Sequence, residues 1–145
     1  MIYLLREFVQ ETDICVSMVK ERMIHLYQQL SNCPMLSDDD FLNIVNENLI
    51  FVNVDTERQI CGTITILLER KMIHGGKYVA HIEDVVVDQS CRGQEVGKQL
   101  IHYACEYAKQ HNCYKVILNC NDHVRIFYEK CGFKTKNREM SLYFD

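Results

Sequence analysis

Apolar and polar residues alternate along the first part of the chain with periods that predict one strand and one helix. Residues 2–8 are expected to form the strand. Residues 13–30 have apolar side chains at a roughly helical spacing, with Thr12 or Asp13 as the expected cap of that helix. Pro34 has no amide donor, so the helix is expected to end before it.

A second helix is expected after Ser37, whose hydroxyl suits a cap position. The acidic run at residues 38–40 then lies near the positive end of the helix dipole. The run lacks the glycine and the distal glutamate of a calcium loop, so a charged helix start is favoured over a metal site.

The middle and the C-terminal part of the chain predict a sheet that mixes two connection types. Three strands joined by turns, an antiparallel meander, are expected over residues 49–54, 60–68 and 78–88. A helix, a strand, a helix and two strands should follow, over residues 95–111, 113–120, 122–130, 133–136 and 139–144. Gly132 is the expected left-handed end of the second of these helices. The fold class is therefore α/β (α+β), with a mixed, mostly antiparallel sheet of about seven strands and four helices.

Composition narrows the class of protein. The chain has 145 residues, of which 48% are hydrophobic and 25% are charged, as is usual for a globular domain. We therefore expect residues 1–145 to form a single domain. Its net charge of -4 argues against a general nucleic-acid binder, and no apolar run is long enough to span a membrane.

The eight cysteines indicate a reducing compartment. They include no Cys-x-x-Cys pair, the spacing that structural zinc sites usually show, so neither a metal nor a disulfide is expected. The N-terminus lacks the basic and apolar regions of a signal peptide, so the mature protein is expected to start at Met1. We therefore expect reduced thiols and a cytoplasmic location.

The junction between the third long strand and the long helix carries the main candidate chemistry. Gly93 and Gly97 lie four apart at the helix start, where a ligand can approach the backbone closely. The unpaired amides and dipole of a helix N-terminus suit phosphate, and Arg92 and Lys98 add positive charge. A Walker A loop would need four residues between its glycines, and a dinucleotide fingerprint would need a third glycine. A phosphorylated ligand is expected here, with an ordinary glycine turn as the alternative.

Residues 92–97, Arg-Gly-Gln-Glu-Val-Gly, resemble the Gln/Arg-x-x-Gly-x-Gly/Ala pyrophosphate loop of the GNAT superfamily of acetyl-CoA-dependent N-acetyltransferases. A narrower resemblance, to the glucosamine 6-phosphate N-acetyltransferase family, covers nearly the whole chain from Tyr3 to Phe144. It is carried by residues 69–74, 81–87, 97–98, 113–118 and 127–133, which agree in order and spacing.

This resemblance implies direct acetyl transfer from acetyl-CoA to the 2-amine of glucosamine 6-phosphate in a ternary complex, a step toward UDP-N-acetylglucosamine. It also implies a homodimer whose active sites are shared between chains. Tyr128 would give a proton to the departing thiolate, although it can also be read as a residue that packs on the sheet. The implied donor-binding residues are Val85, Val86, Val87, Arg92, Gly93, Gln94, Glu95, Val96, Gly97, Lys98, Asn119 and Tyr128.

On the acceptor side, the resemblance makes Glu83 and Asp84 catalytic, because a carboxylate can orient or deprotonate an amine. Lys115 is the expected phosphate partner, with Arg138 and Lys71 as the alternatives. The implied acceptor-binding residues are Ser31, Lys71, Met72, Ile73, His74, Glu83, Asp84, Val85, Tyr114, Lys115 and Tyr143.

Four positions depart from the family pattern. Glu95 stands where the first loop glycine is usual, Asn119 replaces an acidic residue, and Val124 replaces an asparagine. An arginine near the C-terminus is absent from residues 141–144. Two other classes therefore stay open: a GNAT enzyme for another amine, such as a peptide or polyamine, and a non-catalytic acetyl-CoA-binding module.

Overall fold

The computed structural model describes residues 1–145 and contains one mixed sheet. Its strands, in spatial order, are β1 (Ile2–Leu4), β2 (Leu49–Val54), β3 (Ile60–Arg70), β4 (Tyr78–Val87) and β5 (Cys113–Leu118). Neighbouring strands are antiparallel except for β4 and β5, which are parallel. The expected mixed, mostly antiparallel class is confirmed.

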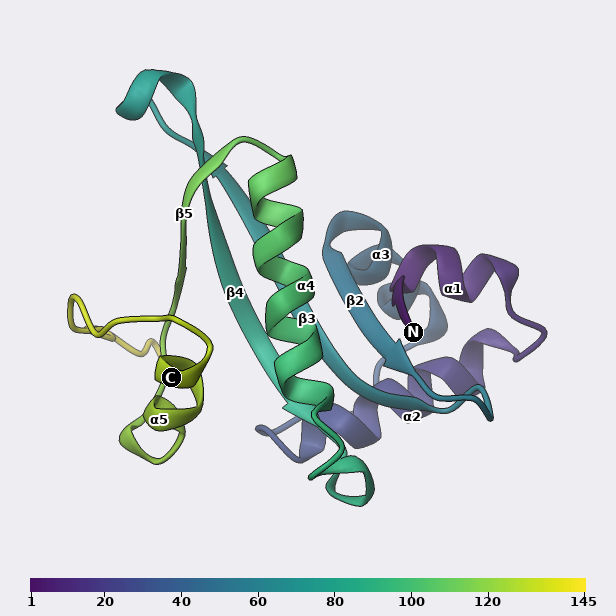
Figure 1. Cartoon of the computed structure of the whole chain (residues 1–145). Coiled ribbons are helices and arrows are strands. Elements are labelled where there is room, and N and C mark those ends of the chain that lie inside the picture. Colours follow the sequence, from purple (N-terminus) through teal and green to yellow (C-terminus); the bar gives the residue numbers. More distant parts are fainter.

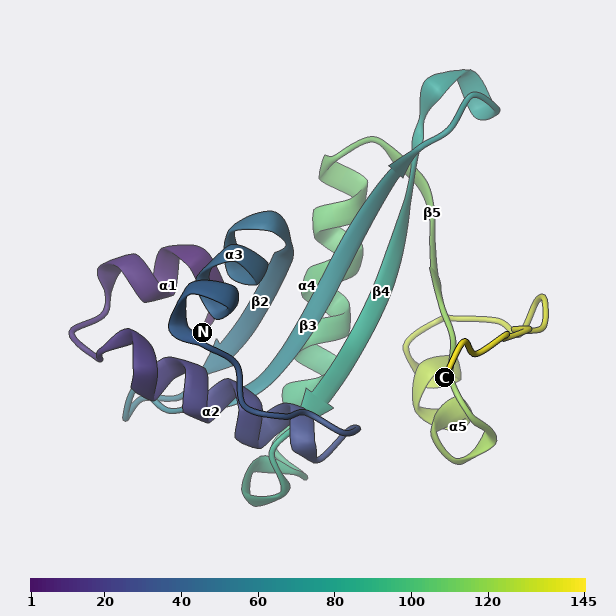
Figure 2. The same cartoon turned by 180° about the vertical axis from the view of Figure 1, so that it is seen from behind.

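Helices cover both faces of this sheet (Figures 1 and 2). One face carries α1 (Leu5–Glu11), α2 (Val16–Gln28) and α3 (Asp38–Glu47), and the other carries α4 (Val96–Gln110). Helix α5 (Asp122–Lys130) follows β5, and single 3-10 turns lie at η1 (His74–Gly76) and η2 (Gln89–Cys91). None of the helices has both the length and the apolar character that a membrane span requires.

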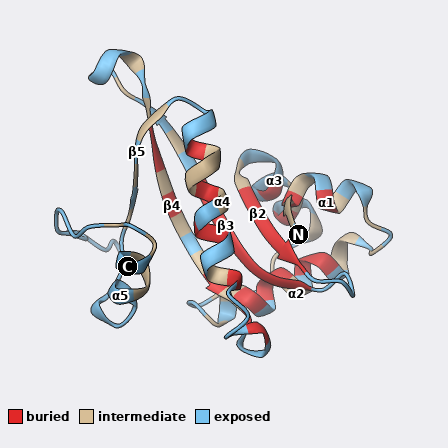
Figure 3. Cartoon of the chain, viewed as in Figure 1, coloured by how far each residue is buried: buried red, intermediate tan, exposed pale blue.

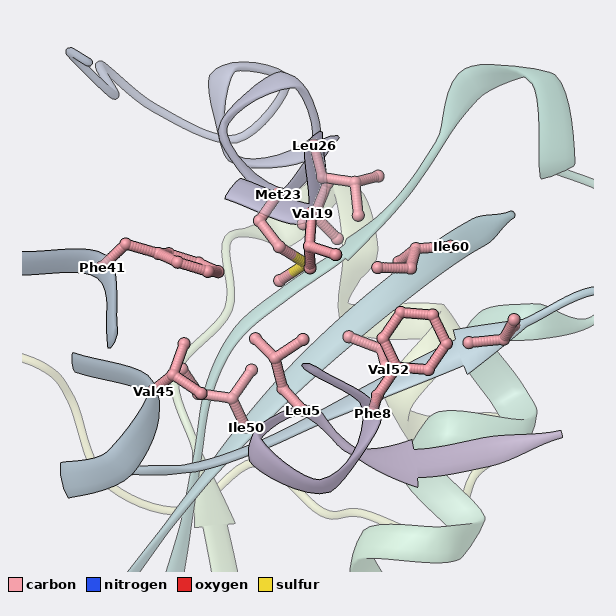
Figure 4. Packing of buried hydrophobic residues seen from close by; sticks show 12 residues of the cluster. Leu5, Phe8, Val19, Met23, Leu26, Phe41, Val45, Ile50, Val52 and Ile60 are labelled. Atoms are coloured by element: carbon pink, nitrogen blue, oxygen red, sulfur yellow. The ribbon is translucent and has the colours of Figure 1, made fainter. Parts of the chain in front are cut away.

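The core is divided by the sheet into two clusters, because side chains alternate across a strand. On β2, Ile50 and Val52 pack with α1, α2 and α3, whereas Phe51 packs with α4. Figure 3 shows that the buried positions concentrate on the central strands and on the helix faces turned toward them. Figure 4 shows the first cluster, in which Leu5 and Phe8 of α1 reach β2. Burial on both faces explains the largely apolar β2 sequence.

Two N-terminal boundaries differ from expectation. Only Ile2–Leu4 is a strand. Helix α1 starts at Leu5, because Leu5 and Phe8 lie one helical turn apart and both are buried on the same side of this helix. Helix α2 begins at Val16, and Thr12 instead accepts a bond from the amide of Ile14 in the preceding turn. The Ser37 cap is confirmed, since its hydroxyl accepts a hydrogen bond from the amide of Asp40 at 3.1 Å.

The last part of the chain also differs. Gly132 ends α5 with φ of 98°, as expected, but residues 133–136 and 139–144 form no strand. A strand needs an edge to pair with, and in the single chain these residues lie on none. The sheet therefore has five strands instead of about seven, and α1 is the helix that was not expected. Apolar side chains of this tail are highly exposed: Met140, Leu142, Tyr143 and Phe144.

Candidate active site

Strand β4 separates from β5 halfway along its length (Figure 1). The pairing of the two strands runs from Tyr78 with Cys113 to Ile82 with Leu118. Beyond that point β4 continues to Val87 alongside β3 only. The backbone groups of residues 83–87 that face the β5 side therefore have no strand partner, and an extended molecule can hydrogen-bond to such an edge.

A β-bulge interrupts the same stretch of β4. The register around it is Thr65 with Glu83 and Thr63 with Val86. Asp84 and Val85 together lie opposite Ile64, and Asp84 has φ of 50°. A bulge changes the direction of nearby side chains. Here it leaves the Asp84 carboxylate exposed at the point where β4 has lost its β5 partner.

The loop after β4 presents a group of free amides. Gly93 has φ of 85° and Glu95 has φ of 60°, after which α4 begins at Val96. No backbone N–H of residues 93–98 donates to another group of the chain. Gly97 allows close packing, because a Cβ there would lie 3.3 Å from the Phe127 ring. A cradle of amides at the start of a fifteen-residue helix fits a pyrophosphate.

The charged side chains of this loop leave the amides accessible. The side chain of Glu95 is 70% exposed, and its carboxylate lies 3.8 Å from the ammonium group of Lys98. Arg92 is exposed and donates from Nε to the carbonyl of Val87 at 3.4 Å. The positive charge of Lys98 partly compensates the negative charge of the Glu95 carboxylate.

Tyr128 lies half-buried on α5, next to the Phe127 ring that contacts Gly97. Its ring lies edge-on to Phe127 at 5.0 Å and to Phe133 at 6.1 Å. Burial raises the pKa of Tyr128, and the neighbouring thiols of Cys120 and Cys131 add to the effect. The hydroxyl therefore stays protonated at neutral pH, as a proton donor must.

A cavity of about 360 Å³ opens between α2, α3 and the sheet, and Asp84 and Ser31 both line it. Most of the residues that line it are apolar, and further polar groups come from Asn32, Asn48 and Thr65. Two residues predicted on the acceptor side thus meet at one cavity, although they are far apart in sequence. Glu83 lies half-buried one residue before Asp84.

Tyr27 of α2 also lines this cavity, and the sequence did not predict it. Burial raises the pKa of Tyr27, opposed by hydrogen bonding with Thr63 and Thr65, and the charge of Asp84 raises it further. In the sequence, Tyr27 belongs to an apolar helix stripe. Nothing in that stripe distinguishes a cavity residue from a core residue.

The other predicted acceptor residues lie at the opposite end of β4. Lys71, Met72, Ile73 and His74 occupy the β3–β4 connection, and Met72 is 99% exposed. The ring of His74 stacks on Tyr114 at 4.0 Å, and the Lys115 ammonium lies 5.7 Å from the centre of the Tyr114 ring. From Tyr78 to Asp84 a strand rises by roughly 20 Å. Within one chain, this basic cluster and the Asp84 cavity do not meet.

Three remaining positions line neither the Asp84 cavity nor the basic cluster at residues 71–74 and 114–115. Asn119 is exposed directly after β5, and Val124 is 42% exposed on α5. Tyr143 is 85% exposed in the tail. The structure therefore assembles the predicted donor side around β4, the loop and α5, and it leaves part of the predicted acceptor side dispersed.

Comparisons with known proteins agree with this geometry. Residues 15–133 match the model of a family described as the acetyltransferase (GNAT) family. A rice protein named probable glucosamine 6-phosphate N-acetyltransferase 2 is 38% identical over 131 residues, which cover 83% of this chain and 79% of the rice chain. The glucosamine 6-phosphate N-acetyltransferase of Arabidopsis thaliana is 33% identical over 138 residues, covering 90% and 93% of the two chains.

Solved structures show the same likeness. The crystal structure of glucosamine-6-phosphate N-acetyltransferase from Arabidopsis thaliana has a TM-score of 0.83 at 32% identity. The match covers 92% of this chain and 97% of the Arabidopsis chain. An acetyltransferase from Trypanosoma brucei has a TM-score of 0.83 at 34% identity, with coverage of 90% and 96%.

Proposed function

The chain belongs to the acetyltransferase (GNAT) family, and we propose that it moves an acetyl group from acetyl-CoA to the 2-amine of D-glucosamine 6-phosphate. The products are N-acetylglucosamine 6-phosphate and CoA, on the route to UDP-N-acetylglucosamine. The observation that carries the proposal is the free β4 edge leading into a loop of unpaired amides. An extended thioester arm fits the edge, and a pyrophosphate fits the amides.

On the donor side, backbone amides of Val85–Val87 hold the pantetheine arm and polarise the thioester carbonyl. The amides of residues 93–98 hold the pyrophosphate, with Arg92 and Lys98 adding positive charge. Amides that are already oriented stabilise the oxyanion that forms during attack, without reorganising. Asn119, exposed at the end of β5, contributes a hydrogen bond to the same arm.

The chemistry is a direct transfer in a ternary complex. Glu83 and Asp84 orient the sugar amine and accept its proton, and the neutral amine attacks the thioester carbon. The carbon–sulfur bond then breaks, and the Tyr128 hydroxyl gives its proton to the departing thiolate. Holding both substrates together supplies much of the rate.

The acceptor side is completed by a second copy of the chain. Because the basic cluster at residues 71–74 and 114–115 lies far from Asp84 in one chain, it acts at the site of the partner. Lys115 there binds the sugar phosphate, and Lys71, Met72, Ile73, His74 and Tyr114 shape the pocket. The exposed apolar tail, Tyr143 included, supports such a homodimer, since exposed apolar segments mark interaction surfaces.

We further propose that residues 1–145 form a single acetyltransferase domain and that it works in the cytoplasm. Both core clusters pack against the same five-stranded sheet, which supports a single domain. Eight unpaired cysteines are typical of a reducing compartment.

The test is thiol release from acetyl-CoA by the purified protein. Glucosamine 6-phosphate and unphosphorylated glucosamine serve as parallel acceptors. We expect rapid release with the phosphorylated sugar only. Binding of acetyl-CoA without release in either reaction would contradict the proposal and favour another amine or a binding role.

A further inference from the structure

The carboxylate of Asp88 connects the donor loop to helix α2. Asp88 follows β4 directly and is 5% exposed. Its Oδ1 accepts hydrogen bonds from the amide of Ser90 at 2.8 Å and from the Ser90 hydroxyl at 2.7 Å. This oxygen therefore fixes the turn η2, from which the loop of free amides continues.

The second oxygen of Asp88 faces two side chains of α2 and that of Gln29, the residue that caps its C-terminal end. Oδ2 lies 2.8 Å from a terminal nitrogen of Arg22, 3.5 Å from Nε2 of Gln29 and 3.8 Å from Nε2 of His25. Arg22 also donates from Nε to the carbonyl of Ile60 at 2.9 Å, so it joins Asp88 to the start of β3. One carboxylate thus ties the turn to both a helix and a strand.

Gln29 makes a second connection to the same turn. Its Oε1 accepts a hydrogen bond from the amide of Gln89 at 3.0 Å, while its Nε2 faces Asp88. Between this turn and α4, the chain passes through Gly93 and Glu95, both at positive φ. Apart from the bond from Arg92 to Val87, no side chain of residues 92–95 bonds to a segment outside the loop and the first turn of α4.

We propose that Asp88, Arg22 and Gln29 are positioning residues for acetyl-CoA, which hold the turn at residues 89–91 so that the amides of residues 93–98 converge on the pyrophosphate. None of the three is placed at the reacting atoms. Their contribution is to order the loop before the ligand arrives, because a loop that must be ordered on binding weakens affinity. The inference rests on the proposed function and adds to it a link between α2 and the donor site.

The variant Gln29→Met tests the link with little change in size. It removes the acceptor for the Gln89 amide at the half-buried C-cap position of α2. The matched control is Gln28→Met at the adjacent last residue of α2, where the side-chain amide nitrogen of Gln28 contacts the carbonyl of Cys33 instead of the loop. We expect CoA to bind Gln29→Met about three- to tenfold more weakly than wild type, the usual effect of one lost hydrogen bond. Gln28→Met should bind CoA like wild type.

A donor without the pyrophosphate separates positioning from general damage. S-acetylpantetheine carries the thioester but does not reach the loop. With acetyl-CoA we expect Gln29→Met to raise the donor KM, with kcat and the acceptor KM within about twofold of wild type. With S-acetylpantetheine the variant and wild type should be equal. An equal loss with both donors would overturn the positioning role.

Asp88→Asn should have a larger effect than Gln29→Met. It keeps an oxygen for Ser90 and removes the charge that faces Arg22, so CoA binding should weaken about tenfold or more, since hydrogen bonds between charged groups are the stronger ones. Binding is measured by calorimetry, which needs no turnover. If wild type binds CoA and Gln29→Met binds it as well as Gln28→Met does, the inference alone is wrong. If wild type binds no CoA, the proposed function is wrong as well.

Discussion

The two substrate sides of the site are built in different ways. In our proposal, the groups that bind the pantetheine arm and the pyrophosphate come mainly from one stretch, residues 85–98, and are mostly backbone amides, while Asn119 and Tyr128 are added from later elements. The proposed acceptor side is made of side chains from α2 and the segment after it, from β4 and from the distant end of the β3–β4 ribbon. As proposed, the donor side is complete in a single chain, and the acceptor side needs a second copy.

This difference explains which departures from the family pattern the fold tolerates. An amide cradle depends on backbone conformation, so Glu95 can replace a glycine while it keeps φ of 60°. A site made of side chains has no such freedom, because each group carries the chemistry itself. The missing C-terminal arginine therefore places the phosphate contact on other basic residues, and Lys115 is the one we propose.

The largest expected effect tests the donor side. Tyr128→Phe removes the proposed proton donor and keeps the ring that packs on Phe127 and Phe133. We expect kcat to fall about a hundredfold, at the lower end of the usual contribution of general acid catalysis. The dissociation constant for CoA should stay within about twofold, because the pyrophosphate contacts are backbone amides. Unchanged kcat would remove Tyr128 from the acid role.

A second prediction compares a buried carboxylate beside the donor loop with an exposed one on the acceptor side. Hydrogen bonds from Ser90 and the charge of Arg22 lower the pKa of Asp88 from 3.8 to about 2. A lowered pKa gives stability that is present above the unfolded value and is lost as pH falls through the folded value. Asp88→Asn should therefore lower the free energy of unfolding by about 2 kcal/mol at neutral pH.

Urea unfolding at several pH values measures this difference. The deficit of Asp88→Asn should shrink as pH falls from about 4 toward 2, because the wild-type carboxyl is then protonated as well. The matched control is Asp84→Asn, an exposed position where stability should change by less than about 0.5 kcal/mol. An Asp88→Asn deficit that does not depend on pH would show that the carboxylate charge is not its cause.

The third prediction concerns the division of the acceptor side. Lys115→Ala should raise the KM for glucosamine 6-phosphate about tenfold, the scale of one charged hydrogen bond, and leave the donor KM unchanged. An unchanged KM for the phosphosugar would place its phosphate elsewhere.

Mixing two impaired chains shows whether the site crosses a dimer. In a dimer of one Tyr128→Phe chain and one Lys115→Ala chain, shared sites leave one site intact. Random pairing at equal amounts, assayed well below the KM for the phosphosugar, should restore about a quarter of wild-type activity. Sites built from a single chain would give only the average of the two separate preparations.

The sequence predicted the local part of the molecule well. The helix after residue 95, the three long strands and the Ser37 cap follow from periodicity and capping, which act over a few residues. The left-handed turn and the free amides at the helix start follow for the same reason, and phosphate binding there stays a prediction. Glycines and a helix start are local features.

The structure differs from the sequence-based prediction where interactions between residues far apart in the sequence decide the conformation. Residues 2–8 allow either a strand or a helix, and burial of Leu5 and Phe8 against distant residues decides for a helix after Leu4. The tail lacks strands because no edge of the single chain pairs with it. The bulge at Asp84 and the place of Tyr27 at the cavity depend on packing across β3, which no window of sequence contains.

The smallest expected effect tests whether the donor side depends on backbone conformation alone. Glu95→Gly keeps the positive φ and removes the Cβ, which relieves backbone strain in the folded state. A more flexible unfolded chain offsets this gain, so the free energy of unfolding should change by less than about 1 kcal/mol. Removing the exposed carboxylate should strengthen CoA binding about two- to threefold at low salt, and less at high salt because salt screens exposed charges. Calorimetry at two salt concentrations measures this, with Glu95→Gln as the control that removes charge and keeps the Cβ. An equal gain in CoA affinity in both variants would assign the effect to charge. A gain in Glu95→Gly alone would assign it to the backbone.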